Sequence, residues 1–251
     1  MADTAYTTEA LPPHTDNTYF TEPAGLQAFH MLSHEPDENG ECWGGQSILV
    51  DGFNAARILR QNDPRAYRIL TDFKLTWHAS GNKGIAICPD EHYPVFDNMG
   101  GTALHRIRWN NDDRGVLPFN FRIPPLAWYK AARKFDGIIN RESMQRRFPL
   151  TPGTVLSEWI PPLRRWAFWG YSLLMVIYIV FDNWRVLHGR EAFKGIRRMC
   201  GAYSELHPDL VPCSQYLQTT ADTQIVTRDD FMSRYINTNM DRADVLRRVS
   251  G

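Results

Sequence analysis

FDNWRVLHGRE at residues 181–191 and HTDNTYF at residues 14–20 are the stretches that decide the fold and chemistry of this chain. The first contains His188, and the second contains His14 and Asp16. Two imidazoles and one carboxylate can occupy one face of an octahedral metal ion and leave the other face open, as oxygen chemistry at non-haem Fe(II) requires. We therefore predict that these two distant stretches meet in the fold and hold one metal ion.

The spacing of the HxD motif suits a metal-binding strand. Residues two apart in a strand project from the same face, so His14 and Asp16 can bind one ion while Thr15 points away. The motif alone is a weak signal, because a second HxD at residues 207–209 stands in a polar stretch where nothing indicates function. An aromatic-rich run follows the first HxD, and we assign the metal to that one.

Length, charge and cysteine content exclude several classes of protein. A chain of 251 residues with 43% hydrophobic content can bury a full core, and we interpret residues 1–251 as one domain. The 28 basic and 28 acidic residues balance, so no overall field favours nucleic acid or an anionic membrane as a partner. The four cysteines form no CxxC pair, which argues against a zinc site or a disulfide framework and favours a reducing compartment.

The start of the chain shows no targeting segment. It is polar and acidic, without the apolar core of a secretory signal or the arginines of a transit peptide. We expect an intracellular protein, cytoplasmic or mitochondrial. Because His14 stands so close to Met1, we also expect the domain to be incomplete at its N-terminus.

An uncharged run at residues 166–181, WAFWGYSLLMVIYIVF, could be mistaken for a membrane span. Its sixteen residues fall short of the roughly 20 that a helix needs to cross a bilayer. We interpret the run as a buried strand or helix and expect no membrane association.

The remaining patterns predict strands around a helical middle, which is a mainly β fold with inserted helices (α+β) of the jelly-roll kind. Strands are predicted at residues 25–34 and 46–53, paired across an acidic, glycine-rich loop, and weaker ones at 85–87 and 104–111. Two short helices are expected within residues 54–73, the second beginning at Pro64. A turn entering a strand is expected at 151–156, and a strand at 184–190. The clearest helical period runs over residues 124–140, with a predicted apolar stripe of Leu126, Tyr129, Ala132, Phe135 and Ile138 or Ile139.

Five motifs resemble the trimethyllysine dioxygenases, which are close relatives of the γ-butyrobetaine dioxygenases. They are HTDNTYF, LVDGF, RWNNDDR, FDNWRVLHGRE and TRDDFMSR, and the resemblance spans most of residues 5–249. These enzymes are Fe(II)/2-oxoglutarate oxygenases built on a double-stranded β-helix. The resemblance implies hydroxylation of N6,N6,N6-trimethyllysine at C3, the first step of carnitine biosynthesis, with Fe(II), O2, 2-oxoglutarate and L-ascorbate.

The same resemblance implies roles for individual residues. His14, Asp16 and His188 would bind iron, and Arg190 and Arg197 of the HGRE-x-F-x-G-x-R pattern would serve 2-oxoglutarate. A planar guanidinium suits the distal carboxylate of that co-substrate, while Arg198 reads as a surface charge. A quaternary ammonium is recognised by aromatic faces. The implied substrate-binding residues are Tyr6, Tyr203, Asn110 and Asn111.

Two segments depart from the family pattern, at residues 157–179 and 204–225. Both begin Ser-Glu and end at an isoleucine that valine follows, and codons for these pairs can hold a GTGAGT splice donor and an AG acceptor. Excision of either segment would restore the family's VLIFDNWR and CGAYITRDDF. Our hypothesis is that both are retained introns of a eukaryotic, fungal gene, and the alternative is two genuine loop insertions.

Three functions follow from these readings. The first is a trimethyllysine dioxygenase, and the second is a γ-butyrobetaine dioxygenase that uses the same chemistry. The third is a catalytically inactive fragment that associates through residues 166–181. A homodimer is left open as well.

Overall fold

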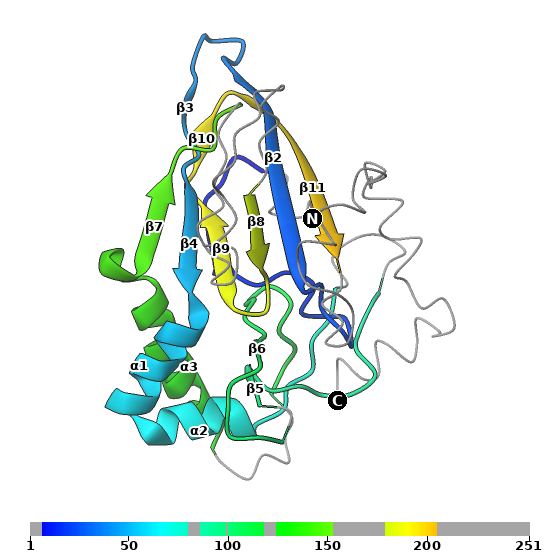
Figure 1. Ribbon diagram of the computed structural model, residues 1–251, viewed down its shortest axis with the longest axis vertical. Helices are drawn as coiled ribbons and strands as arrows, with labels where there is room; N and C mark the ends of the chain where they lie inside the picture. Colours follow the sequence, from blue (N-terminus) through cyan, green and yellow to red (C-terminus); the bar gives the residue numbers. More distant parts are fainter. Residues whose placement is uncertain (1–6, 80–85, 99, 118–123, 153–178, 205–251) are drawn as a thin grey trace, which may run out of the picture.

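The computed structural model describes residues 7–79, 86–98, 100–117, 124–152 and 179–204 (Figure 1). Several sequence predictions fall wholly or mainly outside these ranges. They concern Tyr6, the second HxD motif, the uncharged run, the strand entered after residue 151, the TRDDFMSR motif and the two departing segments.

The described strands form two antiparallel sheets and two short ribbons. The first sheet has the order β1-β9-β4-β7, built from Leu11–His14, Val186–Arg190, Ser47–Asp51 and Gln145–Phe148. The second has the order β11-β2-β8, built from Ile196–Ser204, Leu26–Glu35 and Ile179–Asp182. The ribbons pair β10 (Phe193–Lys194) with β3 (Trp43–Gly44), and β5 (Phe96–Asp97) with β6 (Arg106–Ile107). Two sheets whose neighbours lie far apart in sequence form the predicted jelly-roll.

Alternate side chains of strand β4 belong to two different layers of the hydrophobic core. Ile48 and Val50 belong to the large cluster shared with the helices, whereas Leu49 packs with Met31 and Phe181 between the two sheets. Successive side chains of a strand point to opposite faces, so one apolar run of residues serves both layers. Strand β9 lies beside β4, with His188 opposite Leu49.

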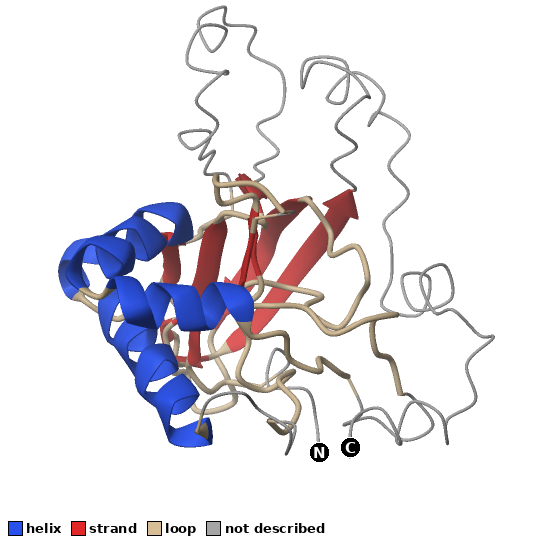
Figure 2. Ribbon diagram, turned by 90° about the horizontal axis from the view of Figure 1, so that it is seen from below, coloured by secondary structure: helices blue, strands red, loops and turns tan. Residues whose placement is uncertain are grey.

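Three helices pack together near the lower ends of β4 and β7 and share one apolar cluster with the first sheet (Figures 1 and 2). They are α1 (Gly52–Asn62), α2 (Pro64–Asp72) and α3 (Pro125–Ile139), and a short 3₁₀ turn, Glu142–Met144, follows α3. Asp51 caps α1 by accepting a hydrogen bond from the Asn54 backbone N–H at 3.1 Å. Asp63 caps α2 in the same way, and Pro64 opens it, as the sequence predicts.

Two local predictions are wrong. Strands β2 and β4 do not pair with each other: β2 pairs with β11 and β8, while β4 pairs with β9 and β7. The loop between them crosses from one sheet to the other, and the true partners lie far away in sequence. In α3, Leu126 and Tyr129 are exposed, because Trp128 and Ala131 take the buried positions of the first turns.

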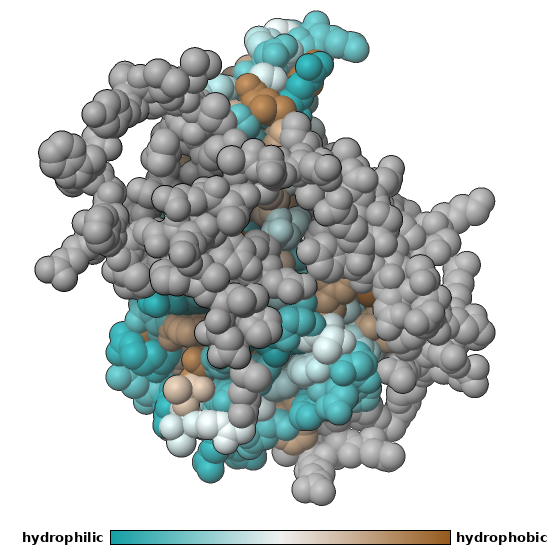
Figure 3. Space-filling view, turned by 45° about the vertical axis from the view of Figure 1, so that its right-hand side comes forward, coloured by the Kyte–Doolittle hydropathy of each residue, from teal (hydrophilic) through white to brown (hydrophobic). Residues whose placement is uncertain are grey.

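The end of the molecule formed by β3 and β10 projects beyond both sheets, at the top of Figure 3. Hydrophilic side chains there surround a few apolar ones. Trp43 of β3 and Ile196, the first residue of β11, are exposed apolar side chains. No helix in the described part of the chain is both long and apolar enough to cross a membrane.

Candidate metal centre

Neighbouring antiparallel strands bring the two predicted histidines together. His14 is the last residue of β1 and lies directly opposite His188 of β9, with ring centroids 4.4 Å apart. Because side chains alternate along β9, Leu187 faces the helices and His188 faces the space between the sheets. There its ring lies 5.1 Å from that of Phe181 and 5.5 Å from that of Phe29. The metal-binding face is therefore lined by aromatic rings.

Asp16 completes the cluster. Its Oδ1 lies 3.3 Å from His14 Nε2, and its Oδ2 lies 3.6 Å from His188 Nε2. One ligand atom from each of the three residues falls within 4.8 Å of the others, and no other such group of three occurs among the described residues. The predicted convergence of the two stretches is confirmed.

The backbone between the two N-terminal ligands differs slightly from the prediction. Strand β1 ends at His14, so Asp16 lies in the bend that follows, before Asn17 with φ of 59°. Thr15 does point away, as predicted: it is 1% exposed, and its Oγ1 accepts a hydrogen bond from the Trp109 N–H at 2.9 Å. Burial of Thr15 turns the side chains on either side of it toward the metal centre.

The donor atoms suit a divalent ion. His14 Nδ1 lies 2.8 Å from the Pro12 carbonyl oxygen, a contact that requires the proton on Nδ1 and leaves Nε2 free as a ligand. Two imidazole nitrogens and a carboxylate with open positions form the three-ligand face typical of non-haem Fe(II).

The protonation states of the three residues are linked. Burial disfavours the charged form of His14, but the hydrogen bond and charge of Asp16 outweigh it and raise the pKa of His14. At His188, burial and the charge of His14 lower the pKa. Burial would raise the pKa of Asp16, yet the charge of His188 and hydrogen bonds with both histidines hold it well below its ordinary value. A metal ion bound at His14 Nε2 would compete with a proton for that nitrogen, so metal binding would weaken as the pH falls.

Two residues that the sequence analysis missed hold Asp16 in place. Asn183 accepts a hydrogen bond from the Asp16 N–H at 2.9 Å and donates one to the Asp16 carbonyl oxygen at 3.1 Å. Gln27, which is 1% exposed on β2, donates from Nε2 to Asp16 Oδ2. The Tyr203 hydroxyl donates to the same oxygen at 2.7 Å. With Oδ2 held by two donors, Oδ1 is the oxygen left to bind a metal.

Replacing Gln27 with Met, which matches its length but donates no hydrogen bond, should weaken Co(II) binding by about 10- to 100-fold, the usual cost of losing a partner that orients a metal ligand. Visible absorption during anaerobic Co(II) titration measures the affinity. Gln145→Met is the matched control, because that amide bonds to the Ile139 carbonyl oxygen and not to Asp16. Equal affinity in the two variants would contradict the role of Gln27.

Comparison with known sequences agrees with this geometry. Residues 1–157, more than half of the chain, match the profile of the family described as "Taurine catabolism dioxygenase TauD, TfdA family". This chain belongs to the TauD/TfdA family.

Several named dioxygenases are similar in sequence to this chain. The trimethyllysine dioxygenase of Neurospora crassa is 47% identical, in an alignment covering 100% of this chain and 50% of the relative. The mitochondrial trimethyllysine dioxygenase of Mus musculus is 36% identical over 80% of this chain and 41% of its own length. Human gamma-butyrobetaine dioxygenase is 27% identical, over 80% of this chain and 46% of its own length. The chain spans about half the length of these relatives.

A solved structure supports the TauD/TfdA fold. An asparagine oxygenase in complex with Fe(II), 2S,3S-3-hydroxyasparagine and succinate superposes with a TM-score of 0.50 at 15% identity, covering 79% of this chain and 50% of the other. At that identity the likeness extends to the fold alone.

The two arginines assigned to 2-oxoglutarate lie on either side of Phe193. The guanidinium carbon of Arg190 is 4.7 Å from the ring centroid, and that of Arg197 is 5.0 Å from it. Arg190 Nη2 already donates to the carbonyl oxygens of Thr7 and Glu9, both at 2.7 Å. Arg197 Nε and Nη1 are buried and have no hydrogen-bond partner among the described residues. Burial and the charge of Arg190 lower the pKa of Arg197 to about 10.

The residues assigned to the substrate occupy different settings. Tyr203 lies against Asp16, and Tyr6 is outside the described residues. Asn110 and the exposed Asn111 follow Trp109, whose backbone is bonded to Thr15 beside the metal centre. The side-chain amide of Asn110 donates to Asp113 Oδ2 at 3.0 Å.

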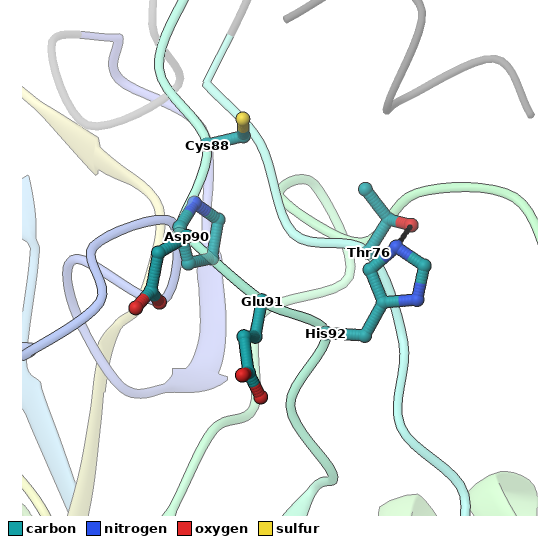
Figure 4. Close-up of a pocket in the computed structure, with 6 residues that line it drawn as sticks. Thr76, Cys88, Asp90, Glu91 and His92 are labelled. Atoms are coloured by element: carbon teal, nitrogen blue, oxygen red, sulfur yellow. Dashed lines mark hydrogen bonds between the residues drawn. The ribbon is translucent and has the colours of Figure 1, made fainter.

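A cavity of about 370 Å³ lies apart from this centre, lined by Thr76, Cys88, Pro89, Asp90, Glu91 and His92 (Figure 4). Its side chains do not converge, and most of their polar groups are already paired. His92 bonds to Thr76, Asp90 accepts from the Tyr93 hydroxyl, and Glu91 pairs with Lys74. The cavity therefore does not compete with the His14 cluster as a metal site.

Proposed function

We propose that the protein is an Fe(II)/2-oxoglutarate-dependent dioxygenase that hydroxylates N6,N6,N6-trimethyllysine at C3, the first step of carnitine biosynthesis. The convergence of His14, Asp16 and His188 on one point carries the proposal. The 47% identity to a fungal trimethyllysine dioxygenase supports the choice of substrate over γ-butyrobetaine, whose human dioxygenase is 27% identical.

The residues of this chain bind and orient the reactants. Iron, when bound by the three ligands, supplies the oxidising chemistry that couples decarboxylation of 2-oxoglutarate to hydroxylation of a C–H bond. Gln27 and Tyr203 hold the carboxylate ligand, and the rings of Phe29 and Phe181 give His188 an apolar surrounding. Precise placement of one substrate carbon is the main contribution that such a site can make.

Arg197 is our assignment for the distal carboxylate of 2-oxoglutarate. Its buried Nε and Nη1 have no hydrogen-bond partner among the described residues. Arg190 has only Nε in that state, while its Nη2 donates to two backbone carbonyl oxygens, and we assign it to positioning the segment before β1. Two buried guanidinium groups around one ring repel each other, and an incoming dianion would relieve that repulsion.

Replacing Arg197 with Met should weaken 2-oxoglutarate binding by about 100-fold, because hydrogen bonds to charged groups contribute about 1.5–3 kcal/mol each. Anaerobic titration of the Fe(II) protein with 2-oxoglutarate, followed by the visible charge-transfer band, measures the affinity. Arg198→Met is the control, since Arg198 is exposed on the same strand. Wild-type affinity in Arg197→Met would refute the assignment.

The substrate's quaternary ammonium would bind aromatic faces, each contact contributing roughly 0.5–2 kcal/mol. We assign Tyr203 and Tyr6 to that role, and Asn110 and Asn111 to the substrate carboxylate. L-Ascorbate would keep the iron ferrous. The compartment is cytoplasm or mitochondria, and the name of the mouse relative favours mitochondria.

Turnover with two substrates tests the proposal. The Fe(II) protein with 2-oxoglutarate and O2 should convert trimethyllysine to its 3-hydroxy product faster than it converts γ-butyrobetaine. Preference for γ-butyrobetaine would make it the second kind of dioxygenase. Absence of both the charge-transfer band and turnover would identify a catalytically inactive fragment.

The segments at residues 157–179 and 204–225 are, in our proposal, inserts foreign to the family. Sequencing the transcript tests this, because cDNA that retains both segments would defeat the retained-intron hypothesis.

A further inference from the structure

Asp113 is a carboxylate beside the metal centre that the proposed chemistry does not yet use. It lies in the RWNNDDR stretch, whose Trp109 is bonded through its backbone to Thr15 between the two N-terminal ligands. Thr18, just after the ligand Asp16, donates from Oγ1 to Asp113 Oδ2 at 2.7 Å. The charges of Asp16 and His14 both influence the Asp113 carboxyl, so it lies within electrostatic reach of the metal ligands.

The carboxyl of Asp113 has no counter-cation among the residues that the structure describes. It makes no salt bridge within the described residues, and the neighbouring guanidinium of Arg114 is directed elsewhere, over the rings of Trp128 and Tyr129. Burial, with the negative charge of Asp16, raises the pKa of Asp113 to about 7 although the Thr18 hydrogen bond opposes this. A half-buried acid with no cation partner among the described residues costs stability and is typical of a functional site.

One oxygen of this carboxyl is available to a ligand. Thr18 and Asn110 both donate to Oδ2. Oδ1 makes no hydrogen bond with the described residues, and it is absent from the buried atoms that lack a partner. It is therefore an acceptor open to whatever enters the site.

The chemistry of the proposed substrate matches this position. Trimethyllysine carries an α-ammonium group on the carbon next to C3, so the group that binds the ammonium must lie close to the metal. The α-carboxylate sits on the same carbon, which calls for a donor and an acceptor side by side. Asn110 and Asp113, 3.0 Å apart between Nδ2 and Oδ2, are such a pair. γ-Butyrobetaine has no α-ammonium and would leave Asp113 without a cation.

We propose that Asp113 binds the primary α-ammonium group of an amino-acid substrate and thereby selects trimethyllysine over betaines that lack that group. The inference rests on the proposed function. It adds the specificity residue for the end of the substrate nearest the metal, where a charge-assisted hydrogen bond in a buried setting is strong.

A cycle of two enzymes and two substrates tests the contact. The substrates are trimethyllysine and 6-(trimethylammonio)hexanoate, which differs from it only by lacking the α-amino group. The variant is Asp113→Asn, which keeps an oxygen acceptor for Thr18 but loses the charge. The control is Asp112→Asn, the same change at the exposed neighbouring residue. Steady-state kcat/KM is measured, together with calorimetric binding to protein loaded with Zn(II) and 2-oxoglutarate, where no turnover occurs.

We expect Asp113→Asn to lower kcat/KM and affinity for trimethyllysine by about 10- to 100-fold, the usual worth of a hydrogen bond between charged groups. The deamino analogue should bind and react equally well with wild type and variant, and Asp112→Asn should behave as wild type with both. Equal losses with both substrates, or no loss with either, would overturn the inference and indicate a purely structural Asp113.

Two further outcomes are also decisive. The circular-dichroism melting curve of Asp113→Asn shows whether this variant folds. If it does not, the comparison of the two substrates on the wild-type protein still tests the inference. Preference for trimethyllysine over the deamino analogue supports the ammonium contact, and equal binding of the two refutes it. Wild-type protein that binds metal but turns over neither compound would overturn the proposed function, and the inference with it. Turnover of both at equal rates would overturn the inference alone.

Discussion

His188→Ala should lose essentially all bound iron and, with it, the proposed dioxygenase activity. The ring of His188 lies opposite His14 and completes a three-ligand face, so its removal leaves one imidazole and one carboxylate, too few ligands to retain a labile divalent ion. Metal content after anaerobic loading with Fe(II) and desalting measures the effect. The variant should remain folded, because β9 keeps its backbone pairing with both β1 and β4.

His92→Ala is the matched control for this loss. His92 bonds to Thr76 in the cavity apart from the metal centre, and its replacement should leave the iron content at the wild-type level. Unchanged iron in His188→Ala would remove His188 from the ligand set. A loss of activity alone would not identify His188 as a metal ligand, because substitutions far from an active site can also lower the rate of a reaction.

Arg108→Met should destabilise the protein by about 3–5 kcal/mol, the usual cost of removing one side of a buried charged interaction. Arg108 is 0% exposed and donates to three backbone carbonyl oxygens, those of Thr18 at 2.7 Å, Phe20 at 2.6 Å and Thr21 at 2.7 Å. Methionine fills much of the space but leaves these acceptors buried without donors. Urea unfolding followed by tryptophan fluorescence gives the change in free energy of unfolding.

The same substitution should also weaken metal binding, since the three carbonyls belong to the segment that follows Asp16. Arg133→Met is the control, an exposed arginine on α3 whose loss should change the unfolding free energy little. A loss of less than about 1 kcal/mol in Arg108→Met, within the range of ordinary surface changes, would contradict an organising role.

Local features of this fold could be predicted because neighbouring residues determine them. Pro64 starts the second helix as predicted, and the structure adds Asp63 as its N-cap. The spacing His14-Thr15-Asp16 predicts that the middle side chain turns away, and Thr15 is buried. The predicted apolar stripe on α3 was wrong in its first turns because helical periodicity locates the buried face only to within about one position. The large ring of Trp128 is buried there instead.

Strand partners could not be predicted from local patterns. Strand β2 is as alternating and apolar as a hairpin strand should be, yet its partners are β8 and β11 near the other end of the described chain. Backbone groups of every strand offer the same donors and acceptors, so pairing depends on how whole faces pack. The residues that hold Asp16 were missed for the same reason, since Gln27 and Asn183 reach it only once the two sheets are assembled.

The amino-acid sequence by itself predicted that His14, Asp16 and His188 meet and that the second helix starts at Pro64, because motif chemistry and local backbone preference are properties of short stretches. Only the tertiary structure shows that Gln27 and Tyr203 both donate to Asp16 Oδ2, that Arg197 has two buried nitrogens without a partner among the described residues, and that Asp113 makes no salt bridge within that part of the chain. Those features depend on desolvation and hydrogen bonding between segments that touch only after the chain has folded.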